Sequence, residues 1–150
     1  MKLLELKKEL LSACIIEIDE RADSLRKVMD DAQQSANDYG QPKDRYDSYR
    51  TQLLRKRDLF GKQLYKILEQ RNILEKINTE RVSDTVKFGA IVITNKQKMF
   101  VSVGIGKMEY GGSDYFVISP GVPFFMAMEG KKAGDSFEFR GQKFEILEVS

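Results

Sequence analysis

The chain has 150 residues, of which 41% are hydrophobic and 32% are charged, and its formal net charge at pH 7 is +2. This composition predicts a soluble, folded protein of one or two small domains, because disordered chains carry fewer apolar residues. There is no histidine and a single cysteine, Cys14, which excludes Ser-His-Asp triads, cysteine–histidine nucleophile pairs, histidine-ligated zinc and internal disulfides.

Charged residues interrupt the apolar run at the start of the chain, Met1–Glu9. A secretion signal and a membrane-spanning helix both need a longer uninterrupted apolar segment. The sequence therefore predicts neither of them here, and it predicts a cytoplasmic protein without a membrane partner.

Two sets of apolar residues, each with a period of seven, run through residues 4–36. They are Leu4, Leu11, Ile18, Leu25 and Ala32, with Ile15, Ala22, Met29 and Ala36 between them. This spacing is typical of a helix whose apolar stripe packs on a second helix. We therefore predict a helix from Lys2 to about Asp38, roughly 55 Å long. Cys14 lies between the stripe residues, and we predict that it is a buried apolar group without a redox role.

A break around Gly40 and Pro42 separates this helix from a second one. Glycine suits the left-handed residue that ends a helix, and proline suits the first turn of the next. From residue 43 to Asn78 the seven-residue repeat returns, in Tyr46, Leu53, Phe60, Ile67 and Leu74. Two such helices joined by a tight turn form an antiparallel hairpin, which we place at residues 1–80 with its tip near 38–47. Because the two stripes can cover each other, the sequence predicts a monomer.

The sequence changes character near residue 85, where glycine becomes frequent and β-branched and aromatic residues begin to alternate with polar ones. Strands are predicted over residues 86–94, 98–103, 115–118, 136–139 and 143–149, with one short helix over Pro123–Met128. Four or five strands and a short helix form a small β-rich domain, which we place at residues 85–150. The predicted fold class is therefore α+β: a helical coiled-coil hairpin followed by a small β-rich domain.

The order of motifs along the chain resembles that of the bacterial Gre transcript-cleavage factors. The hairpin is followed by Val86-Lys87-Phe88-Gly89, then by Ile118-Ser119-Pro120, then by the stretch Pro123–Asp135 with its Gly-Lys-Lys-Ala-Gly-Asp sequence. The resemblance covers almost the whole chain. It implies a C-terminal domain similar in fold to FK506-binding proteins, which docks on RNA polymerase at its secondary channel. The docking residues that it implies are Phe88, Gly89, Pro123, Gly130, Lys131, Gly134 and Asp135.

The same resemblance implies a role for the hairpin tip. In the Gre family, tip carboxylates help the polymerase to hold a second Mg²⁺, and the polymerase then cleaves backtracked nascent RNA. Asp44 is the implied ligand of this shared Mg²⁺, Asp47 lies one helical turn further, and Gln41 stands where the family has its other acid. The chain is thus expected to be an accessory factor rather than an enzyme. It would have no cofactor of its own and would meet the RNA 3′ end only indirectly.

Arg50, Arg55 and Arg57 form a candidate basic patch that could face RNA or the polymerase channel, although a charge run on such a helix is also typical of a solvated face. Asp44 can simply stabilise a helix dipole, and Asp47 can pair with Arg50 across one turn.

The aromatic residues of the second domain are expected in its core: Phe88, Tyr115, Phe116, Phe124, Phe137 and Phe139. Three other functions stay open on the residues alone. They are a polymerase-channel regulator without cleavage activity, a prolyl isomerase or chaperone with a coiled-coil arm, and a coiled-coil adaptor.

Overall fold

The computed structural model describes residues 2–41 and 48–150. Contacts between Cα atoms divide the chain into two compact units. The hairpin unit is Ile15–Asn72, and the sheet unit joins the start of the chain, as far as Cys14, to Ile73–Ser150. The predicted boundary near residues 80–85, which concerns domains that fold independently, stays a prediction.

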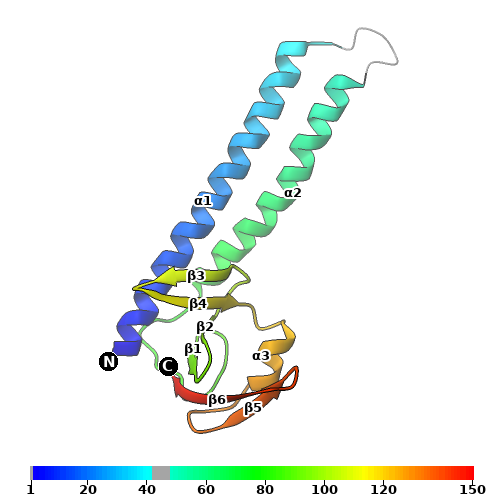
Figure 1. Cartoon of the computed structure of the whole chain (residues 1–150). Coiled ribbons are helices and arrows are strands. Elements are labelled where there is room, and N and C mark those ends of the chain that lie inside the picture. The colour runs from blue at the N-terminus through cyan, green and yellow to red at the C-terminus, as the bar shows by residue number, and fades with distance from the viewer. Residues whose placement is uncertain (1, 42–47) are drawn as a thin grey trace. The chain divides into compact units, whose positions relative to one another are not determined.

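Two long helices, α1 (Lys2–Tyr39) and α2 (Tyr49–Glu75), confirm the predicted helical hairpin (Figure 1). The prediction began the second helix at residue 43, and residues 42–47 lie outside the described residues. At its other end α2 is shorter than predicted. The amides of Lys76 and Ile77 donate to the carbonyls of Ile73 and Leu74 over 3.1 and 3.2 Å. These tighter i to i+3 bonds end the helix before Asn78.

The predicted apolar stripe of α1 is buried in part along the hairpin unit: Ile18, Ala22, Ala32 and Ala36 are at most 4% exposed. The other stripe residues of this unit are partly exposed: Ile15, Leu25 and Met29. The small side chains of the three alanines allow two helices to approach each other closely. A polar contact across the hairpin, from the guanidinium of Arg71 to Asp19 over 2.9 Å, lies at the surface and adds about 0.2–1 kcal/mol at most. Apolar burial therefore dominates the pairing. Among the described residues, no helix combines the length and apolar character that crossing a membrane requires.

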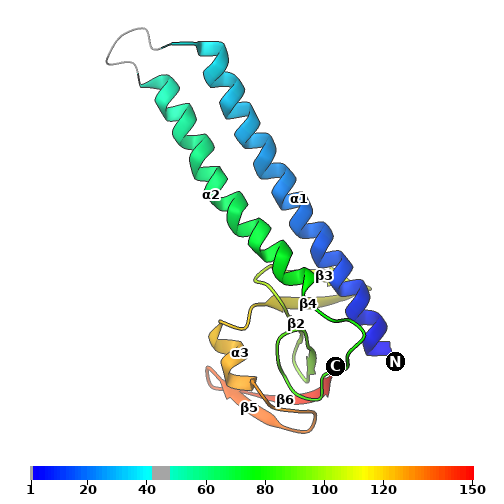
Figure 2. The same cartoon turned by 180° about the vertical axis from the view of Figure 1, so that it is seen from behind.

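Six strands of the sheet unit form one sheet in the order β3-β4-β2-β1-β6-β5. Their bounds are β1 (Ile91–Thr94), β2 (Lys98–Val101), β3 (Gly106–Tyr110), β4 (Ser113–Ile118), β5 (Ser136–Phe139) and β6 (Gln142–Val149). Neighbouring strands are antiparallel except β2 and β4, which are parallel. The short helix α3 (Pro123–Met128) packs beside β5 (Figure 2). The two helices followed by this sheet confirm the α+β class.

The strand predicted over residues 98–103 ends two residues earlier, at Val101, and the strand predictions were wrong in two larger respects. The first strand begins at Ile91 rather than Val86, because Gly89 has a φ of 88° and turns the chain, and because Val86 instead bonds to the backbone of residues 130 and 131. The second error is β3, which was not predicted. It carries few buried apolar residues and depends on a turn in which Gly111 and Gly112 both have positive φ, as type I′ hairpin turns require.

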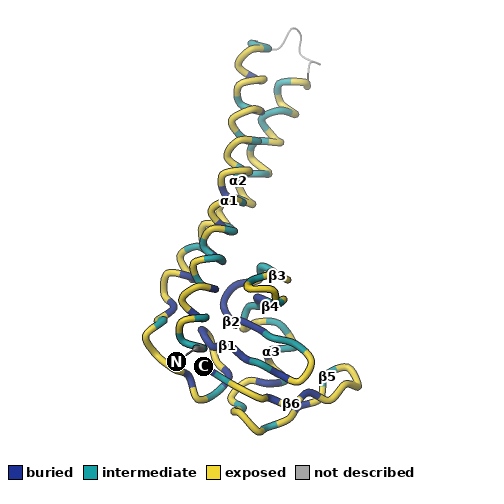
Figure 3. Tube along the Cα trace, turned by 60° about the vertical axis from the view of Figure 1, so that its left-hand side comes forward, coloured by how far each residue is buried: buried dark blue, intermediate teal, exposed yellow. Residues whose placement is uncertain are grey.

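The core of the sheet unit lies between the sheet and α3, and Figure 3 shows the buried chain in dark blue along β1 and β2. Tyr115 and Phe137 are buried, as predicted for the aromatic residues. Phe116, Phe124 and Phe139 are partly buried against the same core. Phe88 is an exception to that prediction, since 37% of it is exposed. The glycine that follows it turns the backbone, which leaves its ring outside the core.

The buried face of α1 changes within the sheet unit. Lys7, Leu10 and Cys14 are almost fully buried there, whereas Leu4 and Leu11 of the predicted stripe are only half-buried. The Cys14 thiol meets the sulfur of Met108 on β3 over 3.9 Å, so part of this face packs on the sheet. A seven-residue repeat that assumes one helical partner along the whole of α1 therefore misplaces the stripe in these first turns. The predicted burial of Cys14 is confirmed.

Candidate functional site

The end of α1 forms one side of the hairpin tip. Gly40 follows the helix with a φ of 80°, and its amide donates to the carbonyl of Ala36 over 3.2 Å. This is the predicted glycine helix end, in which a left-handed residue satisfies a terminal carbonyl. Gln41 is exposed. Asp44 and Asp47, the predicted tip carboxylates, lie outside the described residues.

The start of α2 forms the other side of the tip. Ser48 precedes the helix, and its carbonyl accepts from the amide of Gln52 over 2.8 Å, so Ser48 occupies the capping position that serine favours. The ring of Tyr49 then meets the ring of Tyr39 edge to face, with the centroids 4.8 Å apart. The two helix ends on either side of residues 40–48 are therefore in direct contact.

The described acid nearest to this end of α1 is Asp38. Its carboxylate is exposed and accepts from the side-chain amide of Gln34 over 2.8 Å. Within residues 2–41 and 48–150 no group of three or more cysteine, aspartate or glutamate side chains could hold a metal ion. The described part of the tip thus offers one carboxylate and one amide, from Asp38 and Gln41.

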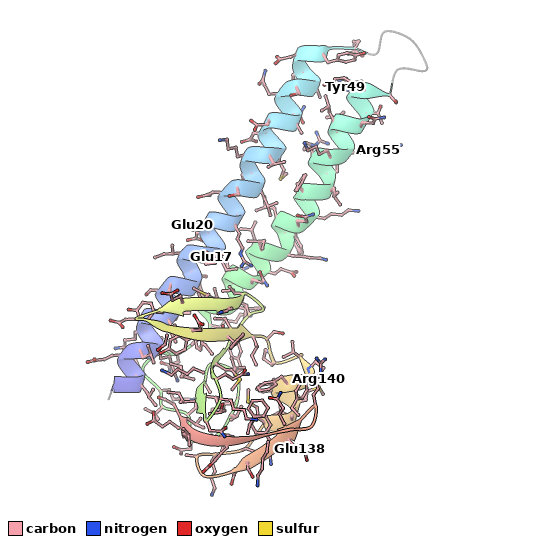
Figure 4. All side chains as sticks on the ribbon, in the orientation of Figure 1. Glu17, Glu20, Tyr49, Arg55, Glu138 and Arg140 are labelled. Atoms are coloured by element: carbon pink, nitrogen blue, oxygen red, sulfur yellow. The ribbon has the colours of Figure 1, made fainter. Side chains whose placement is uncertain are left out.

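The guanidinium groups of the three arginines in the predicted basic patch differ in exposure and in their hydrogen-bond partners. Arg55 is exposed on α2 (Figure 4). Arg57 is paired with Asp58 over 2.6 Å and also donates to Gln33 of α1 over 2.5 Å. Arg50 is partly buried, and its Nε has no hydrogen-bond partner within the described part of the chain. A contact from this patch to a phosphate would come most readily from Arg55, because the Arg57 charge is already offset.

The predicted docking residues of the sheet unit fall at turns and at the start of α3. Gly130 and Gly134 have φ values of 77° and 96°, and Asp135 accepts from the amide of Lys132 over 2.9 Å. The carbonyl of Lys131 accepts a hydrogen bond from the amide of Val86 over 2.7 Å. Pro123 opens α3, where a missing amide hydrogen costs nothing. Each of these residues thus has a conformational role, and their contact with polymerase stays a prediction.

Phe88 and Gly89 belong to a different place in the sheet unit. They line a cavity of about 170 Å³ together with Lys7, whose side chain is only 1% exposed. Sequence reasoning did not single out Lys7, because the seven-residue repeat placed it beside the stripe. A signal was nevertheless present: Lys7 lies three residues before Leu10 and seven before Cys14, on the face that Cys14 was expected to bury.

Comparison with solved structures finds a distant structural similarity. No protein-family model matches the chain, and no curated protein matches it. The crystal structure of GreA factor homolog 1 (Gfh1) of Thermus thermophilus is similar to it. The similarity covers 91% of this chain and 94% of the Gfh1 chain, with 15% identical residues and a TM-score of 0.35. The relation is distant, and we infer neither binding nor activity from it.

Proposed function

We propose that this chain is a Gre-like elongation factor that binds RNA polymerase at the secondary channel and acts there through its hairpin. The observation that carries the proposal is the hairpin itself. Helix α1 has 38 residues and α2 has 27, and at about 1.5 Å per residue α1 is roughly 57 Å long. A rod of this kind suits a factor that reaches into a deep channel.

The contacts along the hairpin support a rod that keeps its shape. The alanines of the α1 stripe are buried, and Arg71 forms an ion pair with Asp19 across the hairpin. At the tip, Tyr39 and Tyr49 join the last residue of one helix to the first of the other. An element that must position a tip inside another protein requires such pairing at both ends.

The chemistry of the proposed activity belongs to the polymerase. The factor would supply Asp44 as an oxygen ligand to a Mg²⁺ shared with the polymerase, with Asp47 or Asp38 adding charge. Magnesium prefers hard oxygen ligands, and the carboxylates of these aspartates are ligands of that kind.

Gln41 favours a second candidate, a polymerase-channel regulator that does not stimulate cleavage. The residue is exposed at the end of α1, in the position that the resemblance assigns to an acid. A neutral amide can orient a metal-bound water but adds no charge for holding Mg²⁺. Such a factor would act by blocking substrate entry or by competing with cleavage factors.

Two measurements on the full chain test both candidates. Retention of the chain by immobilised RNA polymerase tests binding, and the shortening of labelled RNA in backtracked complexes with Mg²⁺ tests cleavage. Binding together with shortening supports the elongation factor, and binding without shortening supports the regulator. Absence of retention at micromolar concentrations would overturn the shared proposal.

A further inference from the structure

The segment between α2 and β1 lies beside the first turns of α1, within the sheet unit (Figures 1 and 2). The ammonium group of Lys7 donates a hydrogen bond to the backbone carbonyl of Arg81 over 3.1 Å. The next residue of α1, Lys8, forms an ion pair with Glu80 over 3.1 Å. These contacts hold the segment against α1.

A cavity of about 170 Å³ lies where this segment meets α1. Four cationic residues line it, together with a hydroxyl residue and an aromatic ring: Lys7, Lys76, Arg81, Lys87, Ser83 and Phe88. None of the described residues that line the cavity is acidic. The cavity therefore gathers positive charge without a carboxylate of its own to offset it.

Lys7 is the least expected member of this group, because its side chain is 1% exposed. Burial lowers the pKa of Lys7, and the neighbouring charge of Lys87 lowers it further. The Arg81 carbonyl satisfies one of the three ammonium donors but supplies no negative charge. Burying a cation without a counter-charge is costly, and an apolar side chain of similar length would stabilise the fold better. The position is therefore easier to explain by an anion that binds there than by stability.

We propose that this cavity binds a small phosphate-bearing anion, held by the buried Lys7 and by the exposed cations Arg81 and Lys87. A phosphate carries more than one negative charge at neutral pH and presents several acceptor oxygens, whereas a carboxylate carries one charge and two oxygens. Lysine and arginine are the usual phosphate-binding side chains. The inference does not depend on the polymerase function proposed above.

The size of the cavity limits what enters it. Pockets for whole small molecules measure about 300–1,000 Å³, so about 170 Å³ accommodates the phosphate group alone. The rest of a phosphate ester would lie outside, next to the ring of Phe88, which is 37% exposed. The cations of the cavity would bind the phosphate group of inorganic phosphate and of a nucleotide in the same way. The two ligands would differ only in the contact of the nucleotide base with the ring of Phe88.

Calorimetric titration of the full chain tests the proposal, with inorganic phosphate and adenosine monophosphate as probes and chloride at equal ionic strength as the reference. We expect saturable binding of phosphate and none of chloride. Tighter binding of adenosine monophosphate, lost in Phe88→Ala, would identify an ester as the ligand. Equal binding of both probes would identify the phosphate group itself.

Variants locate the site. Lys87→Gln and Arg81→Gln should each weaken phosphate binding by about tenfold or more, because each removes a charged contact to the anion. Both side chains are exposed, so the fold should survive, which circular dichroism would verify. Lys143→Gln on β6 is the matched control, since it removes one exposed cation away from the cavity and should leave binding unchanged. Binding that is equal in all three variants and the wild type, or wild-type heats that match chloride, would overturn the proposal.

Discussion

The rings of Tyr39 and Tyr49 meet edge to face at the hairpin tip, with centroids 4.8 Å apart and planes inclined by 61°. Tyr39 is the last residue of α1 and Tyr49 the first of α2. Aromatic pairs of this geometry add about 0.5–1.5 kcal/mol beyond the area they bury. The contact therefore joins the two helices at the tip.

Replacing Tyr49 by alanine should loosen this end of the hairpin. We expect faster hydrogen exchange of the amides in the first turns of α2 and a loss of about 0.5–1.5 kcal/mol in unfolding free energy. Tyr65→Ala is the matched control, because Tyr65 is 65% exposed in the middle of the same helix. Equal exchange rates in Tyr49→Ala and the wild type would show that the ring pair does not hold the tip.

Two glycines of the hairpin should respond to alanine in opposite directions. Gly61 lies inside α2 with helical backbone, and a Cβ there would meet the flexible end of Met29 at 3.4 Å. Gly61→Ala should therefore stabilise the chain by about 0.5–1 kcal/mol. Gly40 has a φ of 80°, which strains alanine, so Gly40→Ala should destabilise it by about 1 kcal/mol. Urea unfolding measures both, and effects of the same sign would contradict the assigned backbone roles.

Tyr110 should make stability depend on alkaline pH. Its hydrogen bond to the Glu9 carboxylate is the main cause that raises the pKa of Tyr110 above its ordinary 10.0, with burial adding to the shift. The unfolded chain then loses this proton first as the pH rises. The stabilisation is complete below pH 10.0 and is lost as the pH passes the folded pKa. Tyr110→Phe should be less stable than the wild type at neutral pH, with a difference that shrinks above pH 10. A difference independent of pH would refute the Glu9 pairing.

Lys7→Met should stabilise the chain by about 1 kcal/mol at neutral pH, because it removes a buried cation and fills the same space. The pKa of Lys7 is lowered below 10.5, chiefly by burial, so the folded chain loses its proton before the unfolded chain does. The burial cost is complete below the folded pKa and falls as the pH rises from there towards 10.5. The wild type should therefore approach the variant in stability across that range. The same variant should lose phosphate binding, and unchanged binding would exclude Lys7 from the site.

Sequence periodicity predicted the buried residues correctly where a helix packs on a single partner helix along its length. Ile18 and Ala36 were placed correctly because one partner helix runs beside this part of α1. Lys7 was missed because the sheet unit replaces that partner, and a repeat in one helix does not reveal what packs against it. Strand β3 was missed because it is an edge strand, stabilised by its turn with β4 rather than by apolar alternation. The tip motif was recognised only through a family resemblance, since neither Asp44 nor Gln41 stands out by spacing.

The tip carries the prediction on which the proposed activity depends. If the chain stimulates cleavage, Asp44→Asn should abolish it while polymerase affinity stays nearly unchanged, because the proposed function assigns the metal to this carboxylate and docking to the sheet unit. Gln41→Asp should increase cleavage, since a second carboxylate lowers the free-energy cost of gathering Mg²⁺. Cleavage is followed by the shortening of labelled RNA at several Mg²⁺ concentrations, and the gain in Gln41→Asp should be greatest where Mg²⁺ is scarce.

A control separates metal binding from a general effect of charge. Asp31→Asn removes an exposed acid from α1 of the same hairpin, away from the basic patch, and it should leave cleavage unchanged. If Asp44→Asn and Gln41→Asp both behave like this control while the chain still binds polymerase, the tip does not hold Mg²⁺. The chain would then act by occupying the channel, because a hairpin of this length can block substrate entry without any metal chemistry.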